Sequence, residues 1–230
     1  MKRIVYTGFS PISDSKYKDG VSARENFIMG FIGTTRTGKT TTAIKLAKEW
    51  KKAKPDSDVV VFDPQGKFIN EKVVINDIEY PLMDYEIDLY ESEDWFDKVL
   101  SMRNILLILD DYRTLCPKAV SNKGWLYLMS LRAEYNIDII YIIHAPSLIH
   151  NILTNYTTRY FIFYTLSTLG SFAKKIPHYE LCQIGVQSVN KYVKNYGKGD
   201  YPNFPYVIVD TLIEKLYAYN MDIELSRKIN

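Results

Sequence analysis

Short apolar runs alternate with longer amphipathic segments along this chain of 230 residues. The runs are rich in β-branched and aromatic residues, which is typical of strands that are covered on both faces. They predict strands at residues 27–32, 59–62, 105–109, 137–144, 160–165 and 206–209. Between them, apolar residues recur at helical spacing and predict helices at residues 39–52, 92–102, 123–135 and 178–195. This alternation predicts an α/β fold with a mainly parallel sheet and helices on both faces.

Three further segments have weaker patterns. Residues 1–26 are polar and rich in turn formers, and we expect them to be a leader that packs on the core. Residues 71–91 predict a small excursion that is rich in strands. Short strands are expected at residues 4–6, 73–75 and 87–90. The tail after Asp210 predicts a short helix with a polar end.

The composition is that of an ordinary globular protein, with 47% hydrophobic and 24% charged residues. The length favours one domain over residues 1–230, in which residues 171–230 extend the core at its C-terminal end. No motif repeats with a period of 20 to 50 residues. A formal net charge of +2 does not by itself indicate a nucleic-acid-binding protein, although a ring of subunits could create a local basic surface.

Nothing in the sequence indicates export or a membrane span. The N-terminus lacks the long apolar region of a signal peptide, and no apolar run approaches 18 residues. The two cysteines, Cys116 and Cys182, fit no metal-binding spacing, and reduced thiols are the simpler interpretation. We therefore expect a soluble cytoplasmic protein.

The strongest motif is a phosphate-binding loop between the first predicted core strand and the first helix. Gly33, Gly38, Lys39 and Thr40 spell G-x-x-x-x-G-K-T. Glycines let backbone N–H groups close around phosphate oxygens, and the next helix points its N-terminus at the same anion. Lys39 is expected to reach the β- and γ-phosphates of ATP, and the Thr40 hydroxyl to bind Mg²⁺. The expected nucleotide-binding residues are Gly33, Thr34, Thr35, Arg36, Thr37, Gly38, Lys39, Thr40 and Thr41.

Two carboxylates follow the strand at 105–109 and predict the second part of the nucleotide site. Asp110 is expected to hold Mg²⁺, directly or through water, beside Thr40. Asp111 is placed to orient or deprotonate an attacking water, and the alternative is a helix-capping or supporting carboxylate. Asp63, after another strand, either lies near the nucleotide or simply forms a turn.

Two further residues depend on context. His144 closes the strand at 137–144, where it could contact the γ-phosphate or the water and report hydrolysis. A solvated histidine at a strand end is the alternative. Arg132 lies on the preceding predicted helix, where an arginine is usually solvated or salt-bridged. If subunits form a ring, Arg132 could enter a neighbour's site as an arginine finger.

These motifs, in this order, resemble the FtsK–HerA superfamily of DNA-pumping ATPases over about residues 27–170. His144-Ala-Pro-Ser147 stands where that superfamily carries a Gln-x-Pro-Ser-like motif, and Asp110-Asp111 replaces the usual Asp-Glu. Paired aspartates on a compact chain are more like the viral A32-type genome-packaging ATPases. The resemblance implies a RecA-like core and a ring, expected to be a hexamer, with ATP between subunits.

The resemblance further implies that the ring pumps double-stranded DNA into a preformed capsid, where a capsid or portal-vertex protein would be a partner. The protein would then act in the host cytoplasm or on the virion. Lysines interleaved with tyrosines near the C-terminal end could follow a phosphate backbone, although a solvated helix is the simpler interpretation. They are Lys174, Lys175, Tyr179, Lys191, Tyr192, Lys194, Tyr196 and Lys198.

Three alternatives stay open at this point. A nucleotide or small-molecule kinase has this size, but no arginine-rich lid segment is found and paired acids suit water activation better. A filamentous-phage morphogenesis ATPase of the zonula-occludens-toxin type shares the core but normally carries a membrane span. A nucleotide-dependent switch would bind partners without pumping.

Overall fold

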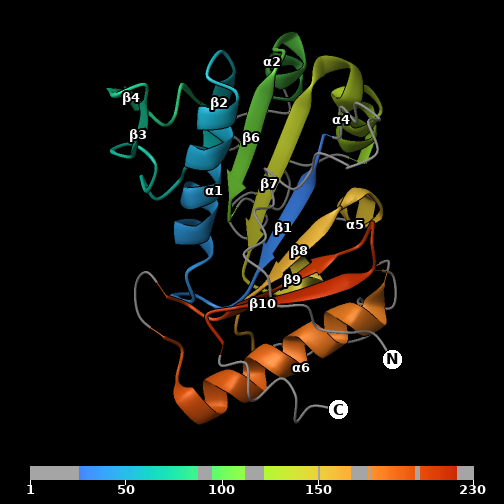
Figure 1. Ribbon diagram of the computed structural model, residues 1–230. Coiled ribbons are helices and arrows are strands. Elements are labelled where there is room, and N and C mark those ends of the chain that lie inside the picture. Colours follow the sequence, from blue (N-terminus) through green and yellow to red (C-terminus); the bar gives the residue numbers. More distant parts are fainter. Residues whose placement is uncertain are drawn as a thin grey trace. The chain divides into compact units, whose positions relative to one another are not determined.

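The computed structural model describes residues 26–87, 95–111, 122–149, 151–166, 176, 178–199 and 203–221. They form an α/β fold whose mainly parallel sheet has eight strands, and a separate two-stranded sheet (Figure 1). The predicted fold class is therefore confirmed. The described chain divides into two compact units with interleaved segments, the first of residues 29–39 and 143–221 and the second of residues 26–28 and 40–142.

The second unit contains the parallel strands in the order β7-β6-β2-β5. Their bounds are β2 Asp58–Phe62, β5 Tyr85–Glu86, β6 Ile105–Asp110 and β7 Ile137–Ile143. Every residue of β6 and β7 is buried, which explains why their sequences are continuous apolar runs and do not alternate. Strands β2, β6 and β7 are parallel to one another, with Val59 paired to Leu106 and Leu109 paired to Tyr141. Strands β2 and β6 therefore end at the same edge of the sheet.

Helix α1 (Lys39–Ala53) follows the phosphate-binding loop. Its buried side chains include Ala43, Ala47 and Trp50, at the helical spacing that predicted it. The indole Nε1 of Trp50 donates a hydrogen bond of 2.7 Å to the fully buried Asp138 on β7. Asp138 also accepts hydrogen bonds from the Phe27 N–H at 2.9 Å and from the Lys54 ammonium at 2.7 Å. This carboxylate therefore ties α1, β7 and the chain entering β1 together.

Helices α2 (Trp95–Ser101) and α4 (Asn122–Tyr135) pack against each other through aromatic rings. The Trp95 and Phe96 rings are stacked, and both meet the buried ring of Trp125 edge-on. A side chain at Gly124 would begin 2.6 Å from the Phe96 ring, so the packing requires glycine there. These buried rings form part of the core of the second unit.

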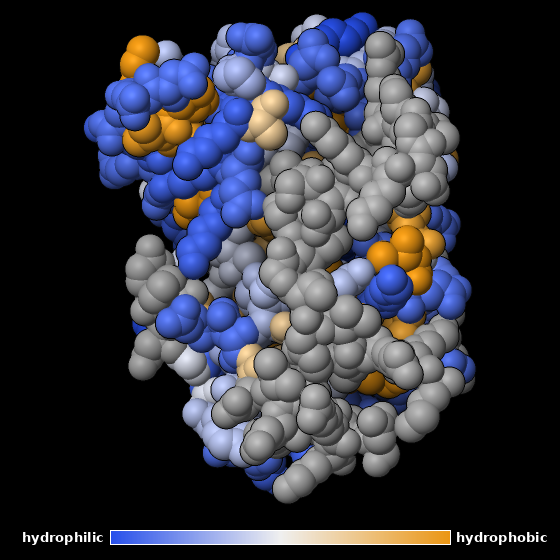
Figure 2. Space-filling view, in the orientation of Figure 1, coloured by the Kyte–Doolittle hydropathy of each residue, from blue (hydrophilic) through white to orange (hydrophobic). Residues whose placement is uncertain are grey.

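The excursion after β2 forms a two-stranded hairpin of β3 (Lys72–Ile75) and β4 (Ile78–Pro81). The strand predicted at 73–75 is confirmed. The strand predicted at 87–90 is wrong at Ile87, which follows β5, and residues 88–90 lie outside the described residues. Asn76 and Asp77 both have positive φ and make the two-residue turn that starts β4 earlier than expected. Apolar side chains are exposed around this hairpin, as Figure 2 shows at its upper left, among them Ile69, Val74 and Ile78.

The first unit carries the strand order β10-β9-β8-β1. Its strands are β1 (Ile28–Ile32), β8 (Arg159–Ile162), β9 (Tyr206–Asp210) and β10 (Lys215–Tyr219). Strands β1 and β8 are parallel, whereas β8, β9 and β10 are antiparallel to one another. Helix α6 (Tyr179–Tyr196) packs on β8, β9 and β10 and ends at Gly197, as predicted (Figure 1). Two short helices, η1 (Pro146–Leu148) and α5 (Asn151–Tyr156), were not predicted.

The helix predicted after Asp210 is wrong over residues 211–221, because strand β10 occupies residues 215–219, and the rest of the tail lies outside the described residues. The Asp210 carboxylate accepts hydrogen bonds from the N–H groups of Leu212 and Ile213 at 3.0 and 3.3 Å. Glu214 has a φ of 54° and completes the turn. Asp210 is held in place by a buried ion pair of 2.9 Å with Arg159 on β8. These contacts fold the tail back as a hairpin.

Several predictions fall on residues that the structure does not describe. They concern the leader except for Asn26, the helix start before Trp95, Cys116, Lys174 and Lys175. The single-domain prediction stays a prediction. Among the described residues, no helix is long and apolar enough to cross a membrane.

Candidate nucleotide site

The phosphate-binding loop is anchored by backbone hydrogen bonds within the first unit. The Gly33 N–H donates to the carbonyl oxygen of Ile143 at 3.3 Å, and the Thr34 N–H donates to that of Tyr164 at 2.8 Å. A side chain at Gly33 would begin 2.7 Å from the Cβ of Phe163. The loop can therefore lie this close to the chain after β8 only because Gly33 has no side chain.

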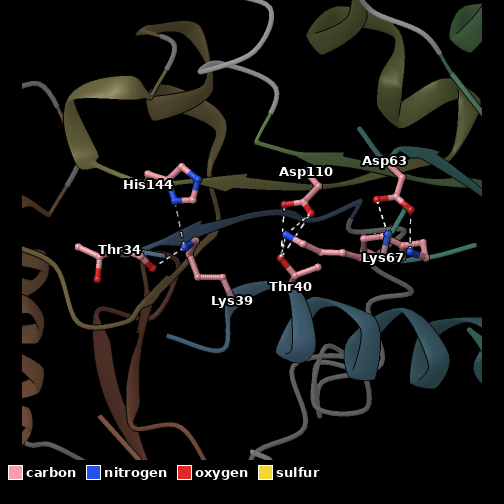
Figure 3. Close-up of polar contacts among 8 residues, drawn as sticks. Thr34, Lys39, Thr40, Asp63, Lys67, Asp110 and His144 are labelled. Carbon is pink, nitrogen blue, oxygen red and sulfur yellow. Dashed lines mark hydrogen bonds and ion pairs between the residues drawn. The ribbon is translucent and has the colours of Figure 1, made fainter. Parts of the chain in front are cut away.

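The loop then closes on itself around one carbonyl group. The hydroxyl of Thr37 and the ammonium of Lys39 both donate to the carbonyl oxygen of Thr34, at 2.8 and 2.7 Å. Figure 3 shows the bond from Lys39. Among the described residues, the backbone N–H groups of Thr35, Arg36 and Gly38 donate to no protein acceptor. Such N–H groups next to a helix N-terminus are available to an anion.

Gly38 has a φ of 89° and lies directly against the ring of Phe204. A Cβ at position 38 would be 2.2 Å from the nearest ring atom, so the backbone angle and the neighbouring ring both require glycine. Phe204 comes just before β9, and its carbonyl accepts a hydrogen bond of 2.8 Å from Asn220 after β10. The sequence analysis missed this contact of Phe204 with the loop.

His144, the first residue after β7, lies beside Lys39, a neighbour that its motif did not predict. Its Nδ1 is 3.4 Å from the Lys39 Nζ (Figure 3). An ammonium can only donate, so this contact requires an unprotonated Nδ1. Lys39 is 5% exposed, and its ammonium is thus held between a carbonyl and an imidazole at the loop.

The acidic part of the site lies in the second unit. The hydroxyl of Thr40 lies 3.4 Å from each carboxylate oxygen of Asp110 (Figure 3). Asp110 is 1% exposed, and burial raises the pKa of its carboxyl above the usual value of 3.8, while Lys67 acts in the opposite direction. Thr40 and Lys39 are consecutive residues of α1.

Lys67 is a member of this cluster that the sequence analysis did not find. Its ammonium lies 3.3 Å from Asp110 Oδ2 and 3.4 Å from the Thr40 hydroxyl. Asp63 shapes the loop that carries it, since its carboxylate accepts hydrogen bonds from the N–H groups of Lys67 and Phe68 at 2.9 and 2.6 Å. Asp63 thus forms the turn, and it also lies near enough to Asp110 for its charge to raise the pKa of that carboxyl.

Asp111 is buried at the end of β6, and its N–H donates to the Ile142 carbonyl at 3.0 Å. Its φ is 53°, a left-handed conformation that Asp tolerates better than most residues and that is often found at functional sites.

Arg132 on α4 contacts the segment that enters β1. Its Nη1 donates to the carbonyl oxygen of Asn26, and the Asn26 side chain donates to the Arg132 carbonyl at 2.7 Å. The guanidinium therefore has an acceptor within its own chain.

Thr35 and Arg36 of the loop are exposed, and Thr41 is half-buried.

The donor set suits a hard divalent cation. Thr40 and Asp110 offer a hydroxyl and carboxylate oxygens, the kind of ligand that Mg²⁺ binds together with waters and phosphates. Among the described residues, no group of three or more His, Cys, Asp or Glu side chains could hold a metal alone. The residues thus fit a Mg²⁺ whose other ligands come from a nucleotide and water.

The described architecture is shared by solved structures of other ATPases. B204, the genome packaging NTPase of Sulfolobus turreted icosahedral virus 2 in complex with ATP-γS, matches with a TM-score of 0.57 and 14% identity over 86% of this chain and 98% of that one. B204, the DNA-packaging ATPase of Sulfolobus turreted icosahedral virus, matches with a TM-score of 0.52 and 16% identity over 85% and 98% of the chains. EssC (ATPases 2 and 3) of Geobacillus thermodenitrificans has a TM-score of 0.52 and 14% identity over 87% and 41%. At these identities the likeness shows the fold.

Comparison of the sequence itself gives a more specific result. A search of curated proteins found no significant match. The family model described as "Helicase HerA, central domain" matches residues 29–158, which run from β1 through the phosphate-binding loop, Asp110 and His144 to the start of β8. The chain therefore belongs to the family of the HerA helicase central domain, and so to the P-loop ATPases of the FtsK–HerA superfamily.

Proposed function

We propose that this protein is an ATP-driven DNA translocase that packages a viral genome into a preformed capsid. The contact that carries the proposal is the one between Thr40 and Asp110 at 3.4 Å, because ATP hydrolysis of this type requires a hydroxyl and a carboxylate beside one metal ion. Two viral packaging ATPases match this chain over 98% of their own length, and this likeness supports the packaging role.

The residues take the following roles in the proposed reaction. Lys39 and the loop N–H groups bind the phosphates, and Thr40 and Asp110 would hold Mg²⁺. Bound there, the ion would neutralise charge on the phosphates. Asp111 orients or deprotonates the attacking water, and His144, in contact with Lys39, responds to loss of the γ-phosphate.

Contacts within the first unit favour a nucleic-acid partner. Helix α6 ends in exposed lysines, and the Lys198 ammonium lies 5.0 Å from the centre of the Tyr164 ring. These residues line a pocket of about 470 Å³ together with Lys194 and Asn190. The Tyr164 carbonyl in turn accepts the N–H of Thr34. A DNA backbone bound at the lysines would thus be connected to the phosphate-binding loop through one residue, Tyr164.

The proposed working form is a homo-oligomeric ring, a hexamer by the resemblance, with a capsid or portal-vertex protein as a further partner. In such a ring Arg132 would leave Asn26 and act as an arginine finger in the neighbouring site.

ATP turnover with and without DNA tests the proposal. We expect Mg²⁺-dependent ATP hydrolysis that double-stranded DNA stimulates severalfold, together with a ring in light scattering. Phosphate transfer to a nucleoside instead of water would support the kinase alternative. Turnover that ignores both single- and double-stranded DNA would contradict translocation and favour a nucleotide-dependent switch.

A further inference from the structure

Lys67 occupies a position in the acidic cluster that no motif predicts. Its Nζ lies 3.3 Å from Asp110 Oδ2 and 3.4 Å from Thr40 Oγ1, so one ammonium contacts both groups assigned to Mg²⁺ (Figure 3). An ammonium is a compact cation with three donors, and oxygen atoms are its natural partners. In this conformation Lys67 therefore provides the positive charge beside Asp110.

The backbone of Lys67 is held while its side chain can move. Asp63 accepts the N–H groups of Lys67 and Phe68, and the Phe68 side chain is fully buried. The Lys67 side chain, in contrast, is 39% exposed. The four-carbon stem can consequently swing into solvent without any change in the loop that carries it.

The Asp110 carboxylate needs a cation. Its side chain is 2% exposed, and an unpaired charge at such a site is strongly unfavourable. A divalent ion bound to the same oxygens would repel an ammonium at this distance, and the repulsion is larger than in water because the carboxylate is buried. A divalent ion at Oδ2 therefore competes with Lys67 for Asp110.

We propose that Lys67 is a displaceable internal cation of the magnesium site, which pairs with Asp110 when the metal is absent and sets the affinity of the site for the metal. The inference rests on the proposed function, because it takes Thr40 and Asp110 as the protein ligands of Mg²⁺. It adds that metal binding includes release of Lys67 into solvent. The lysine acts on metal affinity and is not itself in the hydrolytic machinery.

Metal binding to the nucleotide-free protein tests the inference. Mn²⁺ replaces Mg²⁺, and free Mn²⁺ is measured by electron paramagnetic resonance for wild type, Lys67→Met and Lys67→Arg. We expect Lys67→Met to bind Mn²⁺ about fivefold more tightly, the upper end of the change that removal of one competing, partly exposed ion pair produces. Lys67→Arg keeps the charge and should stay close to wild type. Lys72→Met is the matched control, because Lys72 pairs with Glu79 on the surface of the hairpin that follows the Lys67 loop.

Thermal melts give a second, independent reading. Lys67→Met leaves Asp110 without the ammonium that pairs with it, so the metal-free variant should melt at a lower temperature than wild type. Addition of Mn²⁺ should raise the melting temperature of the variant more than that of wild type. In Lys67→Met/Asp110→Asn, Mn²⁺ should no longer raise the melting temperature.

Wild type that binds Mn²⁺ when ATP is present shows that the metal site exists. In that case, equal Mn²⁺ affinities of wild type and Lys67→Met would overturn the inference. If neither protein binds Mn²⁺ even with ATP, the metal site and with it the proposed function fail as well. The two failures are thus distinguishable.

Discussion

The hydroxyl of Thr40, the second residue of α1, lies 3.4 Å from both carboxylate oxygens of Asp110 at the end of β6. The two residues are 70 positions apart in the sequence. Parallel pairing of β2 with β6 and the position of α1 within the same unit bring them together. This contact places a hydroxyl beside a carboxylate, which is the pairing that a metal-dependent ATPase requires.

Asp110→Asn should make the nucleotide-free protein more stable at neutral pH. Burial raises the pKa of this carboxyl above 3.8, so the unfolded chain ionises at lower pH than the folded chain does. Ionisation therefore destabilises wild type as the pH rises from about 4, and the Asn variant escapes this loss. The difference in Tm between the variant and wild type should grow from pH 4 to pH 7. A difference that shrinks over this range would contradict the argument.

Lys39→Ala should lower ATP turnover by at least about a hundredfold, because the variant lacks the ammonium that stabilises phosphate charge. The measurement is steady-state phosphate release. Lys45→Ala is a suitable control, since Lys45 is exposed on the same helix and should leave turnover near wild type. Turnover of Lys39→Ala above a tenth of the wild-type rate would remove Lys39 from its assigned role.

Asp111→Asn should bind ATP about as well as wild type and hydrolyse it at least about a hundredfold more slowly. Asn has nearly the shape of Asp and also tolerates the φ of 53°, so the backbone at the end of β6 should not change. Nucleotide binding is measured by calorimetry and hydrolysis by single turnover. Asp111→Ala should in addition melt at lower temperature, because Ala tolerates positive φ poorly. Persistent hydrolysis in the Asn variant would show that Asp111 is not the base.

Arg132→Ala should inactivate its neighbours if the protein works as a ring with shared sites. In mixtures with wild type, ATPase activity should then fall below the average of the two pure proteins. The loss of the hydrogen bond to Asn26 should also cost about 1 kcal/mol of stability, so Tm is measured alongside. Arg103→Ala is the control, because the Arg103 guanidinium stacks on Tyr135 of its own chain. Activities that simply average would remove the finger assignment.

Asp138→Ala should destabilise the protein by about 3 to 5 kcal/mol. The substitution leaves the Trp50 indole N–H and the Phe27 N–H without their acceptor in the core, and the Lys54 ammonium without its counter-ion. Denaturant unfolding gives the value. Asp56→Ala, at an exposed turn, should change the stability by no more than about 0.5 kcal/mol. A loss below 1 kcal/mol for Asp138→Ala would contradict the assigned network.

The predicted elements were most accurate where the pattern of apolar residues is local, as on the buried face of a helix or in a fully buried strand. Helix α1 was predicted at 39–52 and extends over Lys39–Ala53, and β6 was predicted at 105–109 and extends over Ile105–Asp110. The prediction for the tail after Asp210 was wrong because the conformation of this segment depends on the buried ion pair of Arg159 with Asp210. No local sequence pattern contains that pair.

By itself, the sequence determined the phosphate-binding loop, the six core strands from β1 to β9 that were predicted, four of the helices and the superfamily, because each of these is encoded by neighbouring residues whose spacing reflects one physical requirement. Only the tertiary structure decided which side chains share a site across long separations. It brought the Lys67 ammonium to Asp110, 43 residues away, and showed Asp63 as the residue that shapes the Lys67 loop. Such contacts depend on the register of β2 against β6 and on side-chain packing, neither of which a single sequence specifies.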